Sequence, residues 1–353
     1  FKKIQDLRVA IVGLGYAGLP LAVEFGKIRG VLGFDLSSKR VSELNVFFDR
    51  TNELTREELL EAKQLVVTDD PTLLKTCNFY IITVPTPVDF NNKPDFSILE
   101  NASELVGSML DGGDVVVFES TVYPGATEEI CAPILERVSG LKYSQKTVLE
   151  ESSVFYLGYS PERINPGDKE HKLKDIIKIT SGSTEEVANL VDALYATIIL
   201  AGTYLAENIR IAEAAKVIEN VQRDVNIALV NELAMIFDSL DLDTTKILEA
   251  AKSKWNFLPF TPGLVGGHCV GVDPYYLIEK SIEAGHEPTL ILAGRRVNDD
   301  TCLFVARKII KIMNKKKIKV VGAKILILGA AFKENCSDVR NSKIVTLAKF
   351  FQK

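Results

Sequence analysis

Two short apolar segments separated by a glycine-rich turn and a helix-compatible stretch open this chain, and they constrain its fold more than any other feature. Residues 8–13 read RVAIVG, and residues 31–36 read VLGFDL. Apolar runs of strand length on either side of a helix are typical of a βαβ unit, in which the two strands are parallel. The start of the chain therefore predicts an α/β fold built on a parallel sheet.

The glycine-rich turn has the spacing of a dinucleotide-binding fingerprint. Gly13, Gly15 and Gly18 form GLGYAG directly after the first strand, and Asp35 ends the second strand 17 residues after Gly18. The first glycine permits the tight turn, the second lets backbone amides approach a pyrophosphate, and the third allows close packing of helix on strand. A carboxylate at Asp35 accepts ribose hydroxyls and repels a 2′-phosphate, which favours NAD over NADP. The alternative is a glycine-rich turn that binds no nucleotide.

The alternation of strands and helices continues through the first part of the chain. Further buried strands are predicted at residues 78–84, 114–121, 154–160 and 175–180. Helical stretches separate them at residues 97–110, 125–138 and 184–196. This pattern predicts a Rossmann-like, doubly wound parallel sheet covered by helices on both faces, over residues 1–205.

The pattern changes to helices after about residue 205. Residues 206–240 contain no proline or glycine and carry apolar residues at helical spacing, which predicts one long helix. Shorter helices are expected at residues 243–252 and 274–285, and a second long one at 289–314. We expect residues 206–317 to form a central helical domain, whose long apolar helix makes a homodimer the default.

A last glycine-ended apolar run, KILILG at residues 324–329, predicts the first strand of another Rossmann-like domain. Residues 318–353 would be the beginning of that domain, which the printed sequence does not complete.

Composition argues against several classes of function. A net charge of −5 and a pI near 5.5 disfavour nucleic acid as a partner. Five cysteines without CxxC spacing suggest neither a disulfide framework nor a metal site, and a reducing cytoplasm fits best. No apolar run reaches the roughly 18 residues of a membrane span, and the start shows no leader pattern.

One cysteine lies on glycine-flanked backbone, in the stretch GGHCVGVDP at residues 266–274. A thiol such as that of Cys269 can capture an aldehyde, so that a second hydride leaves and a thioester forms. Lys216 and Asn220 are one helical turn apart, where both can face an oxyanion, and Asp273 can orient a water. Spacing alone leaves the alternatives equally open: a small buried cysteine and a solvated Lys/Asn face.

Two further segments end predicted strands at the carboxyl edge of the sheet, where ligands of open α/β sheets bind. They are TVPTP at residues 83–87 and EST at residues 119–121. Each is equally consistent with a simple turn at the end of a strand.

Seven motifs, in this order, resemble the UDP-glucose/GDP-mannose dehydrogenase family and, within it, the UDP-N-acetylhexosamine 6-dehydrogenases. The motifs are GLGYAG, VPTP, ESTVYPG, YSPERINPGD, EAAKVIEN, GGHCVGVDP and FKENCSDVRNS. The resemblance covers essentially all 353 residues.

The resemblance implies catalytic roles for the residues already singled out. Cys269 would be the nucleophile, Lys216 and Asn220 would stabilise the oxyanion, and Asp273 with a water would assist proton transfer. It adds Thr121 and Glu162 beside the nicotinamide and the hydrolytic water.

Glu162 would be the base of thioester cleavage. UDP-glucose dehydrogenases carry a second glutamate four residues after this position, where the present chain has Pro166. The proton path of hydrolysis is therefore expected to differ, and UDP-glucose is a less favoured substrate.

The resemblance also implies binding contacts. Those to the cofactor would come from Gly13, Gly15, Tyr16, Ala17, Gly18, Asp35, Arg40, Thr83, Pro85, Thr86, Ser120, Thr121 and Arg340, the last at the pyrophosphate. Those to the substrate would come from Glu162, Arg163, Lys216, Asn220, Phe260, Gly266, Gly267, Arg295 and Lys333.

Two of these substrate contacts have alternatives. Arg295 and Arg296 are adjacent on a helix and cannot both face the diphosphate, and a solvated pair is the alternative. Residues 257–263 would cradle the nucleotide or, equally, pack as a turn on the core.

The expected reaction is the NAD-dependent oxidation of the 6-hydroxyl of a UDP-N-acetylhexosamine to a carboxylate, with UDP-N-acetylglucosamine favoured and the galacto epimer next. The sugar configuration depends on a few hydroxyl contacts, so it stays open. The rivals are a UDP-glucose or UDP-N-acetylmannosamine 6-dehydrogenase, a two-electron dehydrogenase of the hydroxyacid kind, and a non-catalytic NAD-binding module.

Overall fold

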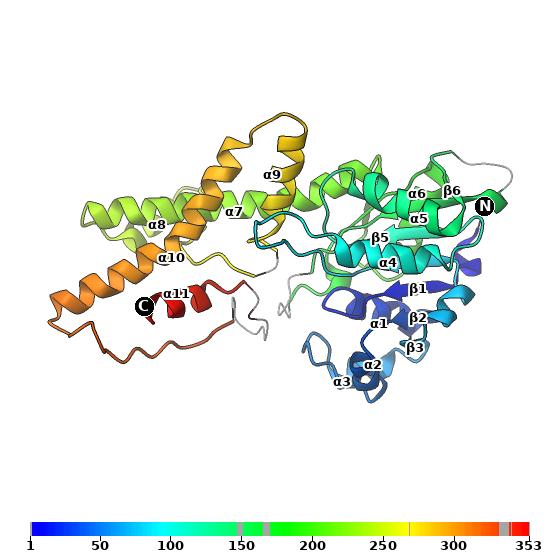
Figure 1. The fold of residues 1–353 in the computed structure, drawn as a ribbon, viewed down its shortest axis with the longest axis horizontal. Helices are drawn as coiled ribbons and strands as arrows, with labels where there is room; N and C mark the ends of the chain where they lie inside the picture. Colours follow the sequence, from blue (N-terminus) through cyan, green and yellow to red (C-terminus); the bar gives the residue numbers. More distant parts are fainter. Residues whose placement is uncertain are drawn as a thin grey trace. The chain divides into compact units, whose positions relative to one another are not determined.

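The computed structural model describes residues 2–146, 151–164, 170–267, 269–331, 339 and 341–352 (Figure 1). Three positions named above, Pro166, Lys333 and Arg340, lie outside these residues. The chain divides into two compact units, Phe1–Val217 and Ile218–Lys353.

A seven-stranded parallel sheet forms the centre of the first unit. Its strands are β1 (Val9–Val12), β2 (Val31–Phe34), β3 (Leu65–Thr68), β4 (Phe79–Ile82), β5 (Val115–Phe118), β6 (Lys142–Tyr143) and β7 (Val154–Tyr159). Their order is β3-β2-β1-β4-β5-β7-β6, and every neighbouring pair is parallel. The predicted doubly wound sheet is confirmed. Its order reverses between β1 and β4, which is where such sheets bind ligands.

Helices connect these strands. They are α1 (Gly18–Ile28), α2 (Ser38–Asn45), α3 (Arg56–Glu61), α4 (Ser97–Gly107), α5 (Ala132–Ser139) and α6 (Glu185–Ala196). Short turns of helix add η1 (Ile4–Asp6), η2 (Pro71–Thr76), η3 (Thr127–Cys131), η4 (Glu151–Ser153) and η5 (Leu173–Asp175). A separate pair of parallel strands, β8 (Lys178–Thr180) and β9 (Thr203–Leu205), follows.

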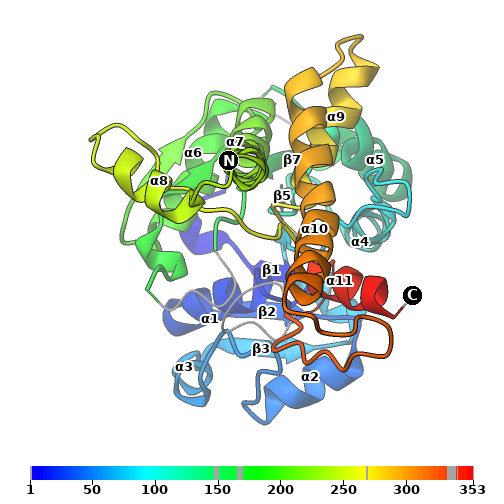
Figure 2. The ribbon, with the colours of Figure 1, turned by 90° about the vertical axis from the view of Figure 1, so that its left-hand side faces the viewer.

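The strand side chains alternate between the two faces of the sheet, because successive residues of a strand point in opposite directions. One face carries Val9, Ile11, Phe79, Ile81, Val115 and Val117, and these pack in one buried cluster with residues of α1 and α6. Helices α4 and α5 pack together, and Figure 2 shows them on the opposite side of the sheet from α1 and α6. Both faces are therefore covered, which explains why the strands are apolar throughout rather than alternating.

The second unit is helical. The long helix α7 (Ile209–Ser239) begins in the first unit and is followed by α8 (Thr244–Lys252), α9 (Asp273–Glu283), α10 (Thr289–Lys315) and α11 (Lys343–Phe351). Helix α10 packs against α9 and α11, and Cys302, Ala306 and Leu347 form a small buried cluster between α10 and α11. The predicted long helix and the three helices after it are confirmed to within a few residues. None of the described helices is both long and apolar enough to cross a bilayer.

The segment predicted as a strand at residues 324–329 differs from the expectation. It forms no strand, and the side chains of Leu326 and Leu328 are 84% and 86% exposed. A strand is stable only when its backbone groups pair with a neighbour, and no described segment pairs with this one.

Candidate active site

The glycine turn after β1 has the geometry that its spacing predicted. Gly13 has a φ of +99°, which only glycine adopts without strain. A Cβ added to Gly18 would lie 1.9 Å from the carbonyl oxygen of Gly13, so helix α1 starts against the turn itself. A Cβ added to Gly15 would meet nothing within 4 Å. The turn therefore leaves room at Gly15 for a phosphate to approach the backbone.

Asp35 and Arg40 hold the far side of this turn. The carboxylate of Asp35 accepts the backbone N–H groups of Leu14 and Ser37, each at 2.9 Å. Arg40 donates from Nε to the carbonyl of Leu14 at 2.9 Å and from Nη1 to Asp49 at 2.8 Å. Its Nη2 atom is buried without a hydrogen-bond partner among the described residues. A carboxylate acceptor beside an unsatisfied guanidinium donor fits the two ribose hydroxyls of the adenosine half of NAD.

Hydrogen bonds connect the segments that follow β1, β4 and β5. Thr83 donates from Oγ1 to the carbonyl of Gly13 at 2.7 Å, which fastens β4 to the glycine turn. Thr86 donates to the carbonyl of Thr121 at 2.6 Å, and Ser120 donates to the carbonyl of Val84 at 2.6 Å. These side chains therefore fix the two segments to each other rather than simply ending their strands. The predicted residues Tyr16, Ala17 and Thr86 are half-buried, and Pro85 is exposed.

Glu162 follows β7 at the same carboxyl edge. Its Oε1 atom accepts the backbone N–H groups of Arg163 and Ile164, each at 2.6 Å. The Oε2 atom is buried without a hydrogen-bond partner in the described part of the chain, and Nζ of Lys178 lies 3.7 Å away. Arg163 turns its guanidinium to the carbonyl of Ile177, at 3.0 Å.

A buried group of charges behind Glu162 was missed at the level of sequence. Lys178 pairs with Glu119 at 2.8 Å, and the hydroxyl of Tyr195 donates to Glu119. Burial raises the pKa of Glu119 to about 7, with Lys178 acting in the opposite direction and Glu162 in the same one. A lysine within the otherwise apolar residues 176–180, IIKIT, was the signal that could have found it.

Glu213, on α7 in the first unit, is a second buried carboxylate that the sequence did not reveal. It accepts the backbone N–H groups of Gly125 and Thr127 at 2.5 and 2.9 Å. Burial raises its pKa to about 7, although these hydrogen bonds act in the opposite direction. Glu213 therefore fastens α7 to the segment that follows Thr121.

Cys269 lies in the turn that leads into α9. Its carbonyl accepts the backbone N–H groups of Val272 and Asp273 at 2.9 and 2.8 Å. It is partly exposed, whereas Cys77, Cys131 and Cys302 are buried. Burial raises the pKa of Cys131 to about 12, which makes that thiol unreactive at neutral pH. The alternative of a small buried residue therefore describes Cys77, Cys131 and Cys302 and not Cys269.

Asn220 and Asp273 meet in the second unit. Nδ2 of Asn220 donates to Oδ2 of Asp273 at 2.5 Å, and both side chains are buried. Lys216 is four residues before Asn220 in the continuous helix α7, so the two share a helix face, and Lys216 is buried as well. A solvated Lys/Asn face is therefore excluded.

The loop residues predicted for the substrate are anchored to their own unit. Gly263 exchanges two hydrogen bonds with the side chain of Asn231 on α7, at 2.8 and 3.0 Å, which fixes the end of the loop that contains Phe260. A Cβ added to Gly266 would lie 2.7 Å from the carbonyl oxygen of Asn341, and Asn341 donates to the carbonyl of Gly267 at 3.3 Å.

Arg295 is buried within a group of polar side chains. Its Nη1 and Nη2 atoms pair with Asp224 and Asp299 at 2.6 and 2.9 Å, and its guanidinium lies over the ring of Tyr275. Arg296 is exposed, so the two arginines do point in different directions. The guanidinium of Arg295 is thus engaged in ion pairs with protein side chains. Its predicted contact with a diphosphate stays a prediction.

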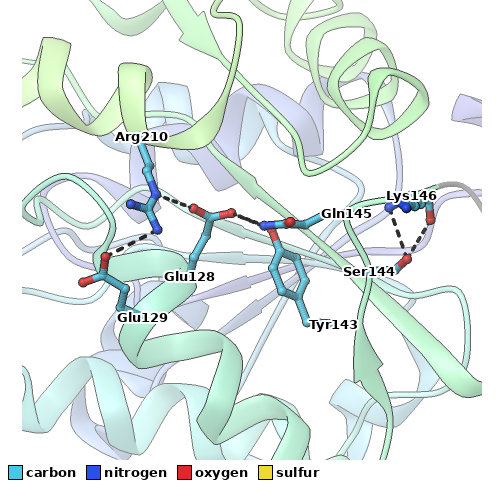
Figure 3. A pocket seen from close by; sticks show the side chains of 7 residues that line it. All are labelled: Glu128, Glu129, Tyr143, Ser144, Gln145, Lys146 and Arg210. Atoms are coloured by element: carbon cyan, nitrogen blue, oxygen red, sulfur yellow. Dashed lines mark hydrogen bonds and ion pairs between the residues drawn. The ribbon is translucent and has the colours of Figure 1, made fainter.

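A pocket of about 570 Å³ lies elsewhere on the first unit, and none of its lining residues was predicted (Figure 3). Glu128 accepts hydrogen bonds from Tyr143, Gln145 and Arg210 at 2.8 to 2.9 Å, and Arg210 also pairs with Glu129. These side chains satisfy one another. Among the described residues, no group of three or more His, Cys, Asp or Glu side chains is arranged to hold a metal ion.

The sequence matches the UDP-glucose/GDP-mannose dehydrogenase family over two stretches. Residues 7–199 match the family's NAD binding domain, and residues 210–300 match its central domain. The first stretch contains the glycine turn, Asp35, Arg40 and Glu162, and the second contains Asn220, Cys269 and Asp273.

Known proteins agree with this match along nearly the whole chain. A UDP-N-acetyl-D-glucosamine 6-dehydrogenase of Salmonella typhi is 59% identical over 98% of this chain and 80% of its own length. A protein of the same name from Pseudomonas aeruginosa is 55% identical over the same shares. The solved structure of a UDP-D-ManNAc dehydrogenase from Pyrococcus horikoshii is 34% identical, with a TM-score of 0.86 over 98% of this chain and 81% of that one. The chain therefore belongs to the UDP-glucose/GDP-mannose dehydrogenase family and carries that family's NAD-binding domain.

Proposed function

We propose that the chain oxidises the 6-hydroxyl of a UDP-N-acetylhexosamine to a carboxylate, in two oxidation steps that share one cysteine-bound intermediate. The observation that carries this proposal is the arrangement in the second unit: a partly exposed thiol at Cys269 in the turn into α9, next to the buried Asn220–Asp273 pair. UDP-N-acetylglucosamine is the favoured sugar, because the relatives named for it are 59% and 55% identical. The structure named for the mannosamine sugar is 34% identical. The galacto epimer is the next choice.

The reaction balances as one alcohol, two NAD⁺ and one water giving one carboxylate, two NADH and three protons. Bound NAD supplies the hydride acceptor for each oxidation. Held by Gly15, Asp35 and Arg40 at one end, it would have its nicotinamide beside Thr121. Every other step falls to side chains of the protein.

Each of the remaining steps is carried out by named side chains. The thiolate of Cys269 adds to the aldehyde carbon, and the second oxidation turns the resulting thiohemiacetal into a thioester. Lys216 and Asn220 stabilise the oxyanion formed in these additions. Asp273 fixes the amide of Asn220 and, with a water, assists proton transfer. Glu162 takes a proton from the water that cleaves the thioester, so that the C–S bond breaks and sulfur leaves as thiolate.

The proposal is tested by counting products. Two NADH per sugar consumed, with a uronate product, support it, while one NADH and an aldehyde or ketone product support the two-electron alternative. A non-catalytic module would bind both ligands without any change in absorbance at 340 nm. A panel of UDP-sugars under the same conditions ranks the gluco, galacto and manno epimers.

Replacing the thiol separates mechanism from binding. Cys269→Ser should abolish uronate formation and leave the Kd for NAD largely unchanged, because the glycine turn, Asp35 and Arg40 lie in the other unit. Cys77→Ala is the matched control, since this buried thiol belongs to none of the predicted contacts. Full uronate turnover by Cys269→Ser would contradict the cysteine mechanism.

A homodimer is part of the proposal. Ile218, Leu229 and Ile236 are exposed at a spacing that places them on one stripe of α7, with exposed fractions of 46% to 55%. A second copy packing on this stripe would bury it. Light scattering of the protein and of Leu229→Glu tests this: a dimer that becomes a monomer supports the proposal, and a monomeric parent contradicts it.

A further inference from the structure

Three side chains behind Glu162 form a buried cluster of charges that the proposed reaction does not yet use. Glu119 directly follows β5, Lys178 is the first residue of β8, and Tyr195 lies on α6. Each of the three is at most 2% exposed, and all belong to the first unit together with Glu162. Four separate elements therefore bring one ammonium, one phenol and two carboxylates together in the protein interior.

The ammonium lies between the two carboxylates. Nζ of Lys178 is 2.8 Å from Oε2 of Glu119 and 3.7 Å from Oε2 of Glu162. The hydroxyl of Tyr195 donates to the other oxygen of Glu119, and Nζ of Lys178 is 5.2 Å from the centre of the Tyr195 ring. Lys178 is thus fixed from one side by Glu119 and Tyr195 and presents its charge to Glu162 on the other.

The oxygen of Glu162 that faces Lys178 is the one with an open acceptor position. Oε1 already accepts two backbone N–H groups, from Arg163 and Ile164. Oε2 is buried and has no hydrogen-bond partner within the described residues. A carboxylate held in this way has one orientation, and its one available oxygen faces the ammonium of Lys178.

Other charged and titratable groups on the same elements are engaged elsewhere. Asp192 on α6 accepts a hydrogen bond from Thr180 at 2.6 Å. The hydroxyl of Tyr159 on β7 donates to the carbonyl of Ser120 at 3.1 Å. Arg163 donates to the carbonyl of Ile177. Among the described groups, Lys178 is therefore the charged side chain that faces Oε2 of Glu162.

Stability alone does not account for a lysine at this position. A buried ion pair is often no more stable than apolar side chains of the same volume, because both charges must be removed from water. The cluster also holds two carboxylates against one ammonium, so it keeps a buried net negative charge until one proton is bound. Burial raises the pKa of Glu119 to about 7, so this carboxyl can take up that proton near neutral pH.

We propose that Lys178 is a positioning residue for thioester hydrolysis, which holds Oε2 of Glu162 in the orientation of the base, with Glu119 and Tyr195 holding Lys178 in place. This inference rests on the proposed role of Glu162. In the step concerned, water forms a bond to the thioester carbon while one of its protons moves to Oε2. The C–S bond then breaks, its electron pair goes to Sγ of Cys269, and the proton on Glu162 leaves to solvent.

The test measures hydrolysis apart from oxidation. Enzyme is mixed with UDP-sugar and excess NAD and is then quenched in acid. Mass spectrometry of the intact protein shows how much of Cys269 carries the acyl group. Lys178→Met should slow hydrolysis about tenfold to a hundredfold, so that the acyl-enzyme accumulates while the first hydride transfer keeps its rate. Lys178→Arg restores a cation and should recover much of the hydrolysis. Equal slowing of both oxidation and hydrolysis in Lys178→Met would overturn the proposal.

Glu119→Gln gives a readout that does not depend on the folding of Lys178→Met. The substitution removes the carboxylate that holds Lys178 from the side away from Glu162. Hydrolysis should therefore slow and the acyl-enzyme accumulate, while the first hydride transfer keeps its rate. Normal hydrolysis in Glu119→Gln, or equal slowing of oxidation and hydrolysis, would overturn the proposal even if Lys178→Met fails to fold.

Glu162→Gln distinguishes this inference from the proposed function. Accumulation of the acyl-enzyme in Glu162→Gln with unchanged hydrolysis in the Lys178 variants removes only the role of Lys178. If Glu162→Gln hydrolyses the thioester at the normal rate, or no adduct forms on Cys269 in any variant, the proposed function itself fails.

Discussion

Asn220 on α7 donates a hydrogen bond of 2.5 Å to Asp273, the first residue of α9, although 53 residues separate the two in sequence. An asparagine amide has two N–H groups, and this bond occupies one of them. The amide therefore has a fixed orientation, with its second N–H able to serve an oxyanion. Because Asp273 is also bonded through its backbone to the carbonyl of Cys269, the pair ties the orientation of the amide to the turn that holds the thiol.

Asn220→Ala should lower kcat about a hundredfold with little change in the KM for NAD, since one preorganised oxyanion donor is lost. Asp273→Asn should produce a smaller loss, because an amide can still hold the side chain of Asn220. Steady-state NADH formation checks both. Asn226→Ala is the matched control: this asparagine is also on α7, and its side chain donates to the carbonyl of Gln222 on the same helix. Equal effects at positions 220 and 226 would show that helix stability alone is involved.

Glu213 should make stability fall as pH rises. Its pKa is raised by burial from 4.5 to about 7, so between these pH values the folded protein binds a proton that the unfolded chain has released. The contribution of Glu213 to the free energy of unfolding is therefore largest below pH 4.5. It declines as the pH rises through 7, by about 3 kcal/mol in all. Glu119 contributes in the same direction.

Denaturant unfolding of Glu213→Gln at a series of pH values between 5 and 8 checks this dependence, because glutamine cannot ionise and its slope should be shallower than that of the parent. Glu207→Gln, at an exposed position just before α7, should keep the slope of the parent. A parallel pair of curves for the parent and Glu213→Gln would contradict the raised pKa.

The sequence predicted those parts of the candidate site that one segment of chain contains or that the family resemblance implied, and missed the buried charges that folding assembles. The glycine turn was predictable because Gly13, Gly15 and Gly18 all act within six residues, and Cys269 because glycines flank it. Lys178 contacts Glu119 and Tyr195, which lie 59 positions before it and 17 positions after it, and no local pattern encodes these contacts. The local sign of Lys178 in the sequence is one charge among isoleucines.

Edge elements were missed for a related reason. Strand β3 has the sequence LVVT, which is apolar in three of its four residues but is followed by Asp69 and Asp70. In the structure it is half-exposed, whereas the central strands β4 and β5 are buried throughout. Strand β6 has only two residues. Conversely, KILILG has the composition of a buried strand, yet without a partner strand its leucines are exposed. An apolar composition shows that a segment is able to form a strand, and a neighbouring strand to pair with decides whether the strand forms.

Asp35 should set the choice between NAD and NADP. Its carboxylate lies at the end of β2, held by the N–H groups of Leu14 and Ser37. Asp35→Ala should raise the KM for NAD about tenfold, because an acceptor for the ribose hydroxyls is lost, and should narrow the preference for NAD over NADP, because a repelling charge is lost. Asp69→Ala, at the exposed position that follows β3, is the matched control. An unchanged ratio of kcat/KM for the two cofactors in Asp35→Ala would contradict this role.

The two glycines of the turn should respond to alanine in opposite ways, and the contrast tests the cofactor site without any assay of the reaction. At Gly18 a Cβ would lie 1.9 Å from the carbonyl oxygen of Gly13 and 2.3 Å from Oγ1 of Thr83, so Gly18→Ala must displace backbone and should cost about 1–3 kcal/mol of stability or more. At Gly15 a Cβ meets nothing within 4 Å, so Gly15→Ala should keep the Tm of the parent. The same methyl would stand where the pyrophosphate must approach the backbone, so the Kd for NAD should rise at least about tenfold.

Thermal unfolding with and without NAD measures both effects together: Gly15→Ala should match the parent without NAD and lose the stabilisation that NAD provides. If Gly15→Ala keeps that stabilisation in full, the cofactor does not lie on this turn.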